Sequence, residues 1–298
     1  MKYYFKAFGL NIESEFPFQG IKIPEKGFFD IDVIKTSIPD HLESIEHKSV
    51  SFESNDKQFL LRIHNVATFL IENGKKVSID PSPNAENREI ELFFMGSAMA
   101  VILMQKGIVP FHGSAFEKNG KCIIISGHSG AGKSSLLRYF ISEGYKALTD
   151  DVCALSVKND KVILSPSYPS SKIWSDVMTA FNLEQNENKQ IRPNINKYQQ
   201  SFLENFYNKP LEVDSIYILR NKMTEVFELE EIKGFEKFKE LKANLYRPKF
   251  PEATNKVKET FIILNQLANQ SKLFNLTRST SIDLLNDFNK FAKEKIIG

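Results

Sequence analysis

Residues Gly120–Phe140 read GKCIIISGHSGAGKSSLLRYF, and this stretch decides the expected fold. The apolar run CIIIS predicts a buried strand, and the apolar spacing of KSSLLRYFIS predicts a helix that ends before Gly144. Between them, Gly127–Ser134 reads GHSGAGKS and fits the pattern GxxxxGK[ST]. A strand, a glycine-rich loop and a helix in this order predict a phosphate-binding loop.

This loop contains the residue types that bind a nucleoside triphosphate. Glycines let backbone N–H groups curl around phosphate oxygens, and the N-terminus of the helix adds partial positive charge. Lys133 is expected to reach the β- and γ-phosphates, and the Ser134 hydroxyl to bind Mg²⁺ of the ATP complex. The expected nucleotide-binding residues are Gly127, His128, Ser129, Gly130, Ala131, Gly132, Lys133, Ser134 and Ser135. His128 and Ser129 are interpreted as spacers rather than catalysts, and the alternative for the whole stretch is a joint that binds no ligand.

The composition limits the class of protein. The chain has 298 residues, of which 42% are apolar and 26% charged, so it can bury a sizeable core. A net charge of +2 does not favour a nucleic-acid-binding protein. Leu92–Met104 is the most apolar segment, but it is too short to span a bilayer and predicts a buried helix.

Two features indicate the compartment. The first residues carry no long apolar stretch, so no signal peptide is expected. Cys122 and Cys153 lie in predicted buried strands and lack metal-ligand spacing, which favours a reducing compartment. A cytoplasmic location is therefore predicted.

The pattern of elements predicts an α/β protein with two regions. Residues 1–85 are strand-rich and form a smaller N-terminal domain, whose strand edges could receive an extended peptide. Residues 86–298 form the ATP-binding domain, which starts with an apolar helix over 88–106 and then alternates strands and helices. Strands are expected at 108–116, 121–126, 145–155, 161–168, 213–220, 225–232 and 272–280, and helices at 133–144, 234–245, 252–269 and 281–295. The polar stretch 183–196 is predicted to be a mobile loop.

Two acids follow the loop helix directly. Asp150 and Asp151 end the apolar strand YKALT, and in a βαβ unit that strand end lies beside the glycine loop. Successive strand side chains point to opposite faces, so the two carboxylates are expected to have different roles. One could hold Mg²⁺ and the other could accept the proton of an acceptor hydroxyl, in either assignment. The alternative is a turn or helix cap, where Asp is common.

Other polar residues are weaker candidates. His112, in FHGSAF, precedes the loop strand and would by itself fit a structural role as well as a catalytic one. Asp176 could be a further metal ligand, and Lys172 a phosphate or peptide contact, near the single Trp174. Cations that could meet phosphate or an acidic peptide, or simply face solvent, are Arg192, Lys197, Arg247 and Arg278.

The block Pro110–Leu155 resembles the core of the HPr kinase/phosphorylase family. His112-Gly113, the GxSGxGKS loop, the Gly144-Tyr145 pair and Asp150-Asp151 occur in the family's order and spacing. The resemblance implies a phosphoenolpyruvate carboxykinase-like P-loop core with a mixed sheet, and a site that uses ATP and Mg²⁺. It also implies that Lys133 binds the transferring phosphate, that His112 lies near the phosphates and that the chain forms a homo-oligomer.

The chain also departs from this family. The Arg-Gly-rich stretch that the HPr enzymes use in dephosphorylation does not follow Asp151, so reversible phosphorylase activity is not expected. The whole chain is more similar in pattern to HPr-kinase-like enzymes that phosphorylate a serine of a lasso peptide precursor. The predicted function is therefore a serine kinase for a peptide. The alternatives are a kinase for HPr or another carrier protein, and a nucleotide-binding regulatory module with weak ATPase activity.

Overall fold

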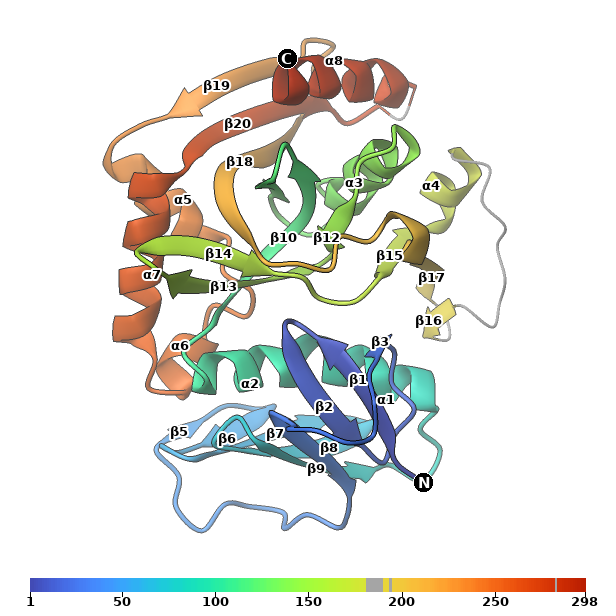
Figure 1. The fold of residues 1–298 in the computed structure, drawn as a ribbon, viewed down its shortest axis with the longest axis vertical. Helices are drawn as coiled ribbons and strands as arrows, with labels where there is room; N and C mark the ends of the chain where they lie inside the picture. The colour runs from blue at the N-terminus through green and yellow to red at the C-terminus, as the bar shows by residue number, and fades with distance from the viewer. Residues whose placement is uncertain (181–189, 193–194, 282) are drawn as a thin grey trace.

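The structure is a computed structural model, and it describes residues 1–180, 190–192, 195–281 and 283–298. Within these residues the chain is a mixed α/β protein whose strands form three sheets (Figure 1). The α/β class expected from the alternation of patterns is thus confirmed. The likeness to a phosphoenolpyruvate carboxykinase core stays a prediction.

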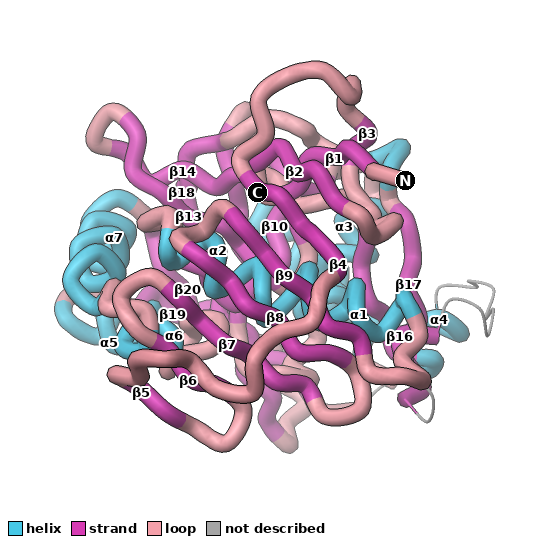
Figure 2. The backbone as a smooth tube through the Cα atoms, turned by 90° about the horizontal axis from the view of Figure 1, so that it is seen from below, coloured by secondary structure: helices cyan, strands magenta, loops and turns pink. Residues whose placement is uncertain are grey.

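The N-terminal region forms one large sheet, as its strand-rich sequence predicted. Its strands run in the order β3-β1-β2-β4-β9-β8-β7-β6-β5, and β4 pairs in parallel with both β2 and β9. Figure 2 shows this sheet from below, lying across helix α2. The strands are β1 (Tyr3–Ala7), β2 (Leu10–Ser14), β3 (Ile21–Lys22), β4 (Ile31–Lys35), β5 (His47–Lys48), β6 (Phe52–Ser54), β7 (Gln58–Ile63), β8 (Ala67–Glu72) and β9 (Lys76–Pro81).

The apolar segment expected as one helix packs against this sheet. It comprises α1 (Asn87–Phe93), a π-helical turn (Phe94–Ala98) and α2 (Met99–Gln105). Its residues share one hydrophobic core with the sheet, so the helix directly after the predicted boundary at 85/86 packs on the N-terminal region. The boundary itself stays a prediction. Across the described residues, none of the helices combines the length and apolar content that crossing a bilayer takes.

A second sheet begins with β10 (Val109–Lys118), and its strands partly close on themselves. β18 (Leu211–Lys222) pairs in parallel with β11 (Lys121–Ser126) and antiparallel with β14 (Lys161–Ser165). Because β10 joins β11 to β13 (Val152–Lys158), which pairs with β14, these strands form a ring. The remaining strands are β12 (Ala147–Thr149), which pairs with β10, and β20 (Lys272–Ser279) and β19 (Glu228–Ile232), which extend from β18.

Helices cover both faces of this sheet, which explains the continuous apolar run of β11. Ile123 and Ile125 pack in the core of α3 (Lys133–Ser142) and α8 (Leu285–Ile297), whereas Ile124 packs toward α5 (Phe235–Ala243) and α7 (Val257–Gln270). Alternate residues of a strand point to opposite faces, so the residues on both faces of β11 must be apolar. Cys122 and Cys153 are buried free thiols within these layers, as expected.

Two elements differ from the prediction. The helix expected at 252–269 is two helices, α6 (Phe250–Ala253) and α7, because Asn255 takes a left-handed backbone (φ 55°) between them. The loop expected at 183–196 is in part a strand pair. Gln190–Arg192 is β16, and Ile195 begins β17 (Ile195–Ser201), which pairs with β15 (Ser170–Trp174); residues 183–189 and 193–194 lie outside the described residues.

Removing one ring at the helix–sheet contact should destabilise the fold. Phe94 is fully buried and stacks on Phe18 with ring centroids 4.5 Å apart. Phe94→Ala is expected to lower the free energy of unfolding by about 3–5 kcal/mol through lost contacts and a cavity. The matched control Phe28→Ala, at a ring that is 77% exposed, should change it by less than about 0.5 kcal/mol. Urea unfolding of both variants tests this, and equal losses would contradict it.

Candidate active site

The glycine loop joins the end of β11 to the start of α3 in a conformation that needs glycine. Gly127, Gly130 and Gly132 all have positive φ, of 130°, 83° and 105°. At Gly127 a Cβ atom would lie 2.8 Å from the carbonyl oxygen of Leu219 on β18. The loop therefore passes close to the neighbouring parallel strand only because no side chain intervenes.

The loop lysine folds back over the loop. Lys133 Nζ donates hydrogen bonds to the carbonyl oxygens of Gly127 and His128, each at 2.9 Å. Burial lowers the pKa of Lys133 to about 8, against the opposing influence of Asp150 and Asp151. Ala131 contributes to the core, and its N–H donates to the His128 carbonyl at 3.1 Å.

The acid pair lies in a break between two strands rather than at the end of one continuous strand. The strand expected over 145–155 is split into β12 and β13, with Asp150 and Asp151 between them. Asp151 has a positive φ of 77°, which ends the extended conformation. β12 is also one strand removed from β11, since β10 lies between them. Asp150 and Asp151 nevertheless lie near the glycine loop, because β12 and β13 on either side of them both pair with β10, and β10 also pairs with β11, the strand before the loop.

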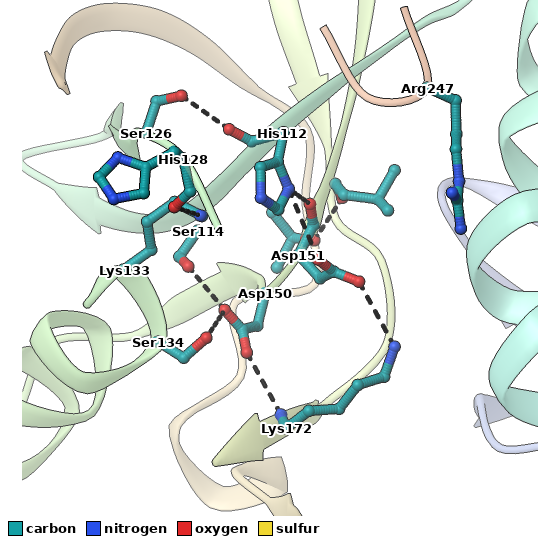
Figure 3. Close-up of polar contacts among 12 residues, drawn as sticks. His112, Ser114, Ser126, His128, Lys133, Ser134, Asp150, Asp151, Lys172 and Arg247 are labelled. Carbon is teal, nitrogen blue, oxygen red and sulfur yellow. Dashed lines mark hydrogen bonds and ion pairs between the residues drawn. The ribbon is translucent and has the colours of Figure 1, made fainter. Parts of the chain in front are cut away.

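Asp150 is tied to the glycine loop by hydroxyl groups. Ser134 Oγ donates to its Oδ1 at 2.9 Å, and Ser114 Oγ on β10 donates to the same atom at 2.6 Å (Figure 3). The backbone N–H of Lys172 on β15 donates to Oδ2 at 3.3 Å. Three separate elements therefore fix the orientation of this buried carboxylate.

Asp151 has different partners. Its Oδ2 lies 3.4 Å from Lys172 Nζ, and its Oδ1 lies 3.5 Å from His112 Nδ1. Burial alone would raise the pKa of Asp151, but the positive charge of Lys172, with smaller contributions from Lys197 and Lys133, outweighs it and holds the pKa below its usual range. Asp151 is therefore an ionised carboxylate whose side chain stays 31% exposed at the site.

Lys172 contacts both acids, one through its backbone and one through its side chain. The ammonium is mostly buried, and burial would lower its pKa, but Tyr168 and Asp151 outweigh this and raise the pKa above its usual value. Lys172 thus remains charged. Lys172 lies in the middle of β15.

His112 lies on the same face of β10 as Ser114, two residues further on. Its Nδ1 is 3.0 Å from the carbonyl oxygen of Asp151, and its own carbonyl accepts a hydrogen bond from Ser126 Oγ at 2.7 Å (Figure 3). Burial, and then the positive charge of Lys133, lowers the pKa of His112. A neutral imidazole at neutral pH follows from this direction.

A cavity of about 140 Å³ lies at the N-terminus of α3, and His112, Lys133 and Asp151 line it. Lys133, Lys197 and Arg278 bring positive charge to it, and Asp151 brings negative charge. Lys197 Nζ sits 5.4 Å from the centre of the Trp174 ring, and Arg278 Nε donates to Asn221 Oδ1 at 3.1 Å. The lining residues are His112, Ser129, Gly130, Gly132, Lys133, Ser134, Ser135, Asp151, Trp174, Val177, Lys197, Arg278 and Leu285.

The remaining predicted residues lie elsewhere. His128 lines a separate surface hollow with Arg220 and Asn221. Arg192 pairs with Glu89 at 3.0 Å, and Arg247 donates to Ser97 at 2.8 Å, so both bind the helix that packs on the N-terminal sheet. The backbone of Asp176 belongs to α4 (Ser175–Ala180), but its side chain lies outside the described part of the structure. Its expected role as a metal ligand therefore stays a prediction.

Ser134 and Asp150 suit magnesium in their chemistry. In the described part of the chain no three His, Cys, Asp or Glu side chains gather in one place. Magnesium carried by a nucleotide needs only one or two protein oxygens, because phosphates and water supply the others. A hydroxyl and a carboxylate oxygen 2.9 Å apart at the loop match that requirement.

Sequence reasoning missed Ser114 and ranked Lys172 and Arg278 too low. Ser114 carried a usable signal, since a strand through His112 places residues i and i+2 on one face. The sequence around Lys172 gives no such signal. Lys172 comes close to the acids only because β15 pairs with β17 and lies next to Asp150 in the folded chain.

Comparisons with known proteins add little to this geometry. Neither a protein-family model nor a curated protein sequence matches the chain. Among solved structures, the Hpr(Ser) kinase/phosphatase from Coxiella burnetii matches with a TM-score of 0.31 and 14% identity. The alignment covers 63% of this chain and 99% of that protein. A likeness of this strength assigns neither fold nor function.

Replacing glycine by alanine at two positions should separate the cost of backbone strain from the cost of a steric clash with β18. Gly127→Ala meets both a positive φ and the Leu219 oxygen, whereas Gly120→Ala meets a positive φ of 76° in open space. The control should cost roughly 1–2 kcal/mol of unfolding free energy, and Gly127→Ala should cost more. Urea unfolding of both variants is the measurement. Equal costs would show that the loop moves away from β18 freely.

Removing the lysine charge should change how stability depends on pH. The lowered pKa of Asp151 contributes stability that is present above the unfolded-state pKa and is lost as pH falls through the folded pKa. Lys172→Met removes the leading attraction, so the folded pKa rises toward the unfolded-state value, and the variant should be less stable at neutral pH and lose less stability on acidification. Unfolding midpoints measured across acid pH test this, with the exposed Lys209→Met as control. Identical acid profiles would refute the assigned cause.

Proposed function

We propose that this protein is an ATP·Mg²⁺-dependent kinase that transfers the γ-phosphoryl group to a serine hydroxyl of a peptide. One observation carries the proposal. Two adjacent carboxylates lie beside a glycine loop and have separate partners: Asp150 bonds to Ser134, and Asp151 lies beside His112 and Lys172. Phosphoryl transfer to a hydroxyl needs these two kinds of carboxylate, one for a metal and one for a proton.

The roles follow from the contacts. Ser134 and Asp150 would hold Mg²⁺, which supplies charge neutralisation at the phosphates. Asp151, ionised and partly exposed to the cavity, accepts the serine proton as the serine oxygen bonds to the γ-phosphorus. The bond from that phosphorus to the ADP oxygen breaks in the same transfer. His112 Nδ1 lies 3.0 Å from the Asp151 carbonyl oxygen and 3.5 Å from Asp151 Oδ1, so the imidazole orients the base.

The positively charged side chains that line the cavity can stabilise the negative charge of the transferred phosphoryl group. Lys133 lies at the loop, and Lys197 and Arg278 also line the cavity. Negative charge spreads over the phosphoryl oxygens in the transition state, and fixed cations that are already oriented stabilise it. Lys133 has a pKa of about 8, so most molecules carry the charge at neutral pH.

The acceptor is proposed to be a peptide, with HPr or another carrier protein as the competing substrate. This rests on the pattern resemblance to kinases of lasso peptide precursors. The regulatory alternative, nucleotide binding with weak hydrolysis, would leave Asp151 without an acceptor to deprotonate. Phosphorylase activity in the reverse direction is not part of the proposal.

Removing the proposed base without altering the backbone tests the mechanism. Asp151→Asn keeps the size of the side chain, and Asn tolerates positive φ as Asp does. Transfer of phosphate to a serine peptide should fall by roughly 10²–10⁴-fold. Asp160→Asn is the matched control, since Asp160 also has positive φ (56°) and lies in the turn between β13 and β14. Mass spectrometry of HPr and of serine-containing precursor peptides incubated with ATP·Mg²⁺ gives the readout.

The outcomes discriminate among the candidate functions. Phosphate on a peptide serine, lost only in Asp151→Asn, supports the peptide kinase. Phosphate on HPr alone moves the function to a carrier-protein kinase. ATP binding without transfer to any substrate would favour the regulatory module and remove the role of Asp151 as base.

A further inference from the structure

A second, larger cavity lies at the edge of the N-terminal sheet. Its volume is about 570 Å³, and its walls come from residues 2–5, the segment 18–23, Pro169 just before β15, Ser201 at the end of β17, and Leu203. Phe5 and Phe18 form a buried aromatic floor, while Leu203 is 60% exposed at the rim. We call this cavity the edge groove.

Strand β1 borders the edge groove, and its pairing with β3 there is short. β3 pairs with β1 through Phe5 and Lys6, and the Ile23 N–H donates to the Tyr4 carbonyl at 3.2 Å. Lys2 and Tyr3 precede this paired stretch and line the groove. A strand edge next to an apolar hollow is the arrangement in which an extended peptide adds main-chain hydrogen bonds and inserts a side chain.

One face of the β15–β17 pair connects the edge groove to the active site. The register places Trp174 opposite Lys197, Lys172 opposite Gln199, and Ser170 opposite Ser201. Alternate residues share a face, so these three pairs follow one another along one side of the hairpin. The Trp174–Lys197 pair lines the active-site cavity, and Ser201 lines the edge groove.

Contacts fix the groove relative to this hairpin. Gln199 Nε2 on β17 donates to Gln19 Oε1 at 3.0 Å, and the Gln19 N–H donates to Glu91 Oε1 on α1 at 2.8 Å. Gln19 itself lines the groove. Gln19, which precedes β3, therefore links α1 and β17 at the groove.

We infer that the edge groove binds the substrate peptide itself, in extended form, at a segment about five residues from the acceptor serine. This inference rests on the proposed kinase function and specifies where its substrate docks. From Ser170 to Trp174 a strand advances ~13 Å, and an extended peptide covers the same distance in about the same number of residues. The groove and the acceptor site thus lie within reach of one short peptide.

The lining residues define the chemistry of that segment. An aromatic or leucine side chain fits the floor of Phe5 and Phe18. The charged residues of the lining are lysines: Lys2, which pairs with Glu13 at 2.7 Å, and the exposed Lys22. An acidic residue beside the apolar anchor therefore complements the groove.

The first experiment varies the peptide and the groove together. The probes are synthetic peptides with one serine in a polar background and a single Phe-Glu pair moved stepwise along either side of it. Phosphorylation kinetics should show the lowest peptide KM at a spacing of about five residues. Leu203→Glu and Lys22→Glu should each raise that KM by about tenfold, with kcat and the KM for ATP unchanged.

Val50→Glu is the matched control, because Val50 is fully exposed in the N-terminal region and lies outside the groove lining. Peptides phosphorylated with the same KM by all variants, or with no dependence on spacing, would overturn the groove and leave the kinase intact. Sedimentation of wild type and Leu203→Glu tests whether a second copy of the chain occupies the groove instead of the peptide. A dimer that Leu203→Glu converts to a monomer would assign the groove to a second copy of the chain and overturn the inference.

A binding arm keeps the test independent of catalysis. The same peptides, carrying a photoreactive phenylalanine as the anchor, are cross-linked to Lys133→Met protein and the labelled residues are mapped. Labels in 2–5, 18–23 or 201–203 support the groove even if no peptide is phosphorylated, in which case only the proposed function fails. Labels confined to other segments, or none above those in Leu203→Glu, overturn the inference.

Discussion

The site depends on one strand, β10, which pairs with three others. Its first half pairs with β13 and its second half with both β11 and β12. The glycine loop follows β11, and the acid pair lies between β12 and β13. Because hydrogen-bond registers are fixed by the faces that each strand buries, β10 holds the loop and the acids at fixed separation. It also contributes His112 and Ser114 from the face between them.

Local pattern was enough for the strand–loop–helix unit and for most strands of the second sheet. CIIIS is apolar on both faces, and GxxxxGKS allows the backbone that the loop adopts, so both are visible in a short window. The break at Asp150-Asp151 was not visible, because an apolar run on each side looks like one strand. Only the two separate pairings with β10 divide it. Lys172 was ranked low for a similar reason, since its charge matters through partners about twenty residues away in the chain.

Two lysines of the site are both largely buried, yet their pKa values shift in opposite directions. Lys133 has carbonyl oxygens as its direct partners, and desolvation lowers its pKa to about 8. Lys172 has Asp151 and two tyrosines around it, and their influence exceeds the desolvation. Lys172, which contacts both acids, therefore keeps its charge over a wider pH range than Lys133, the lysine of the loop.

The left-handed backbone at Asp151 also restricts which residues can replace it over evolutionary time. At φ 77° most side chains are strained, and glycine, asparagine and aspartate are the residues that adopt it readily. Of these, aspartate alone ionises, so the chain geometry and the chemistry select the same amino acid. A descendant of this protein that lost the proposed kinase activity by drift would keep the fold most easily with Asn or Gly at this position. Either residue would then mark the loss of the proposed base in an otherwise unchanged backbone.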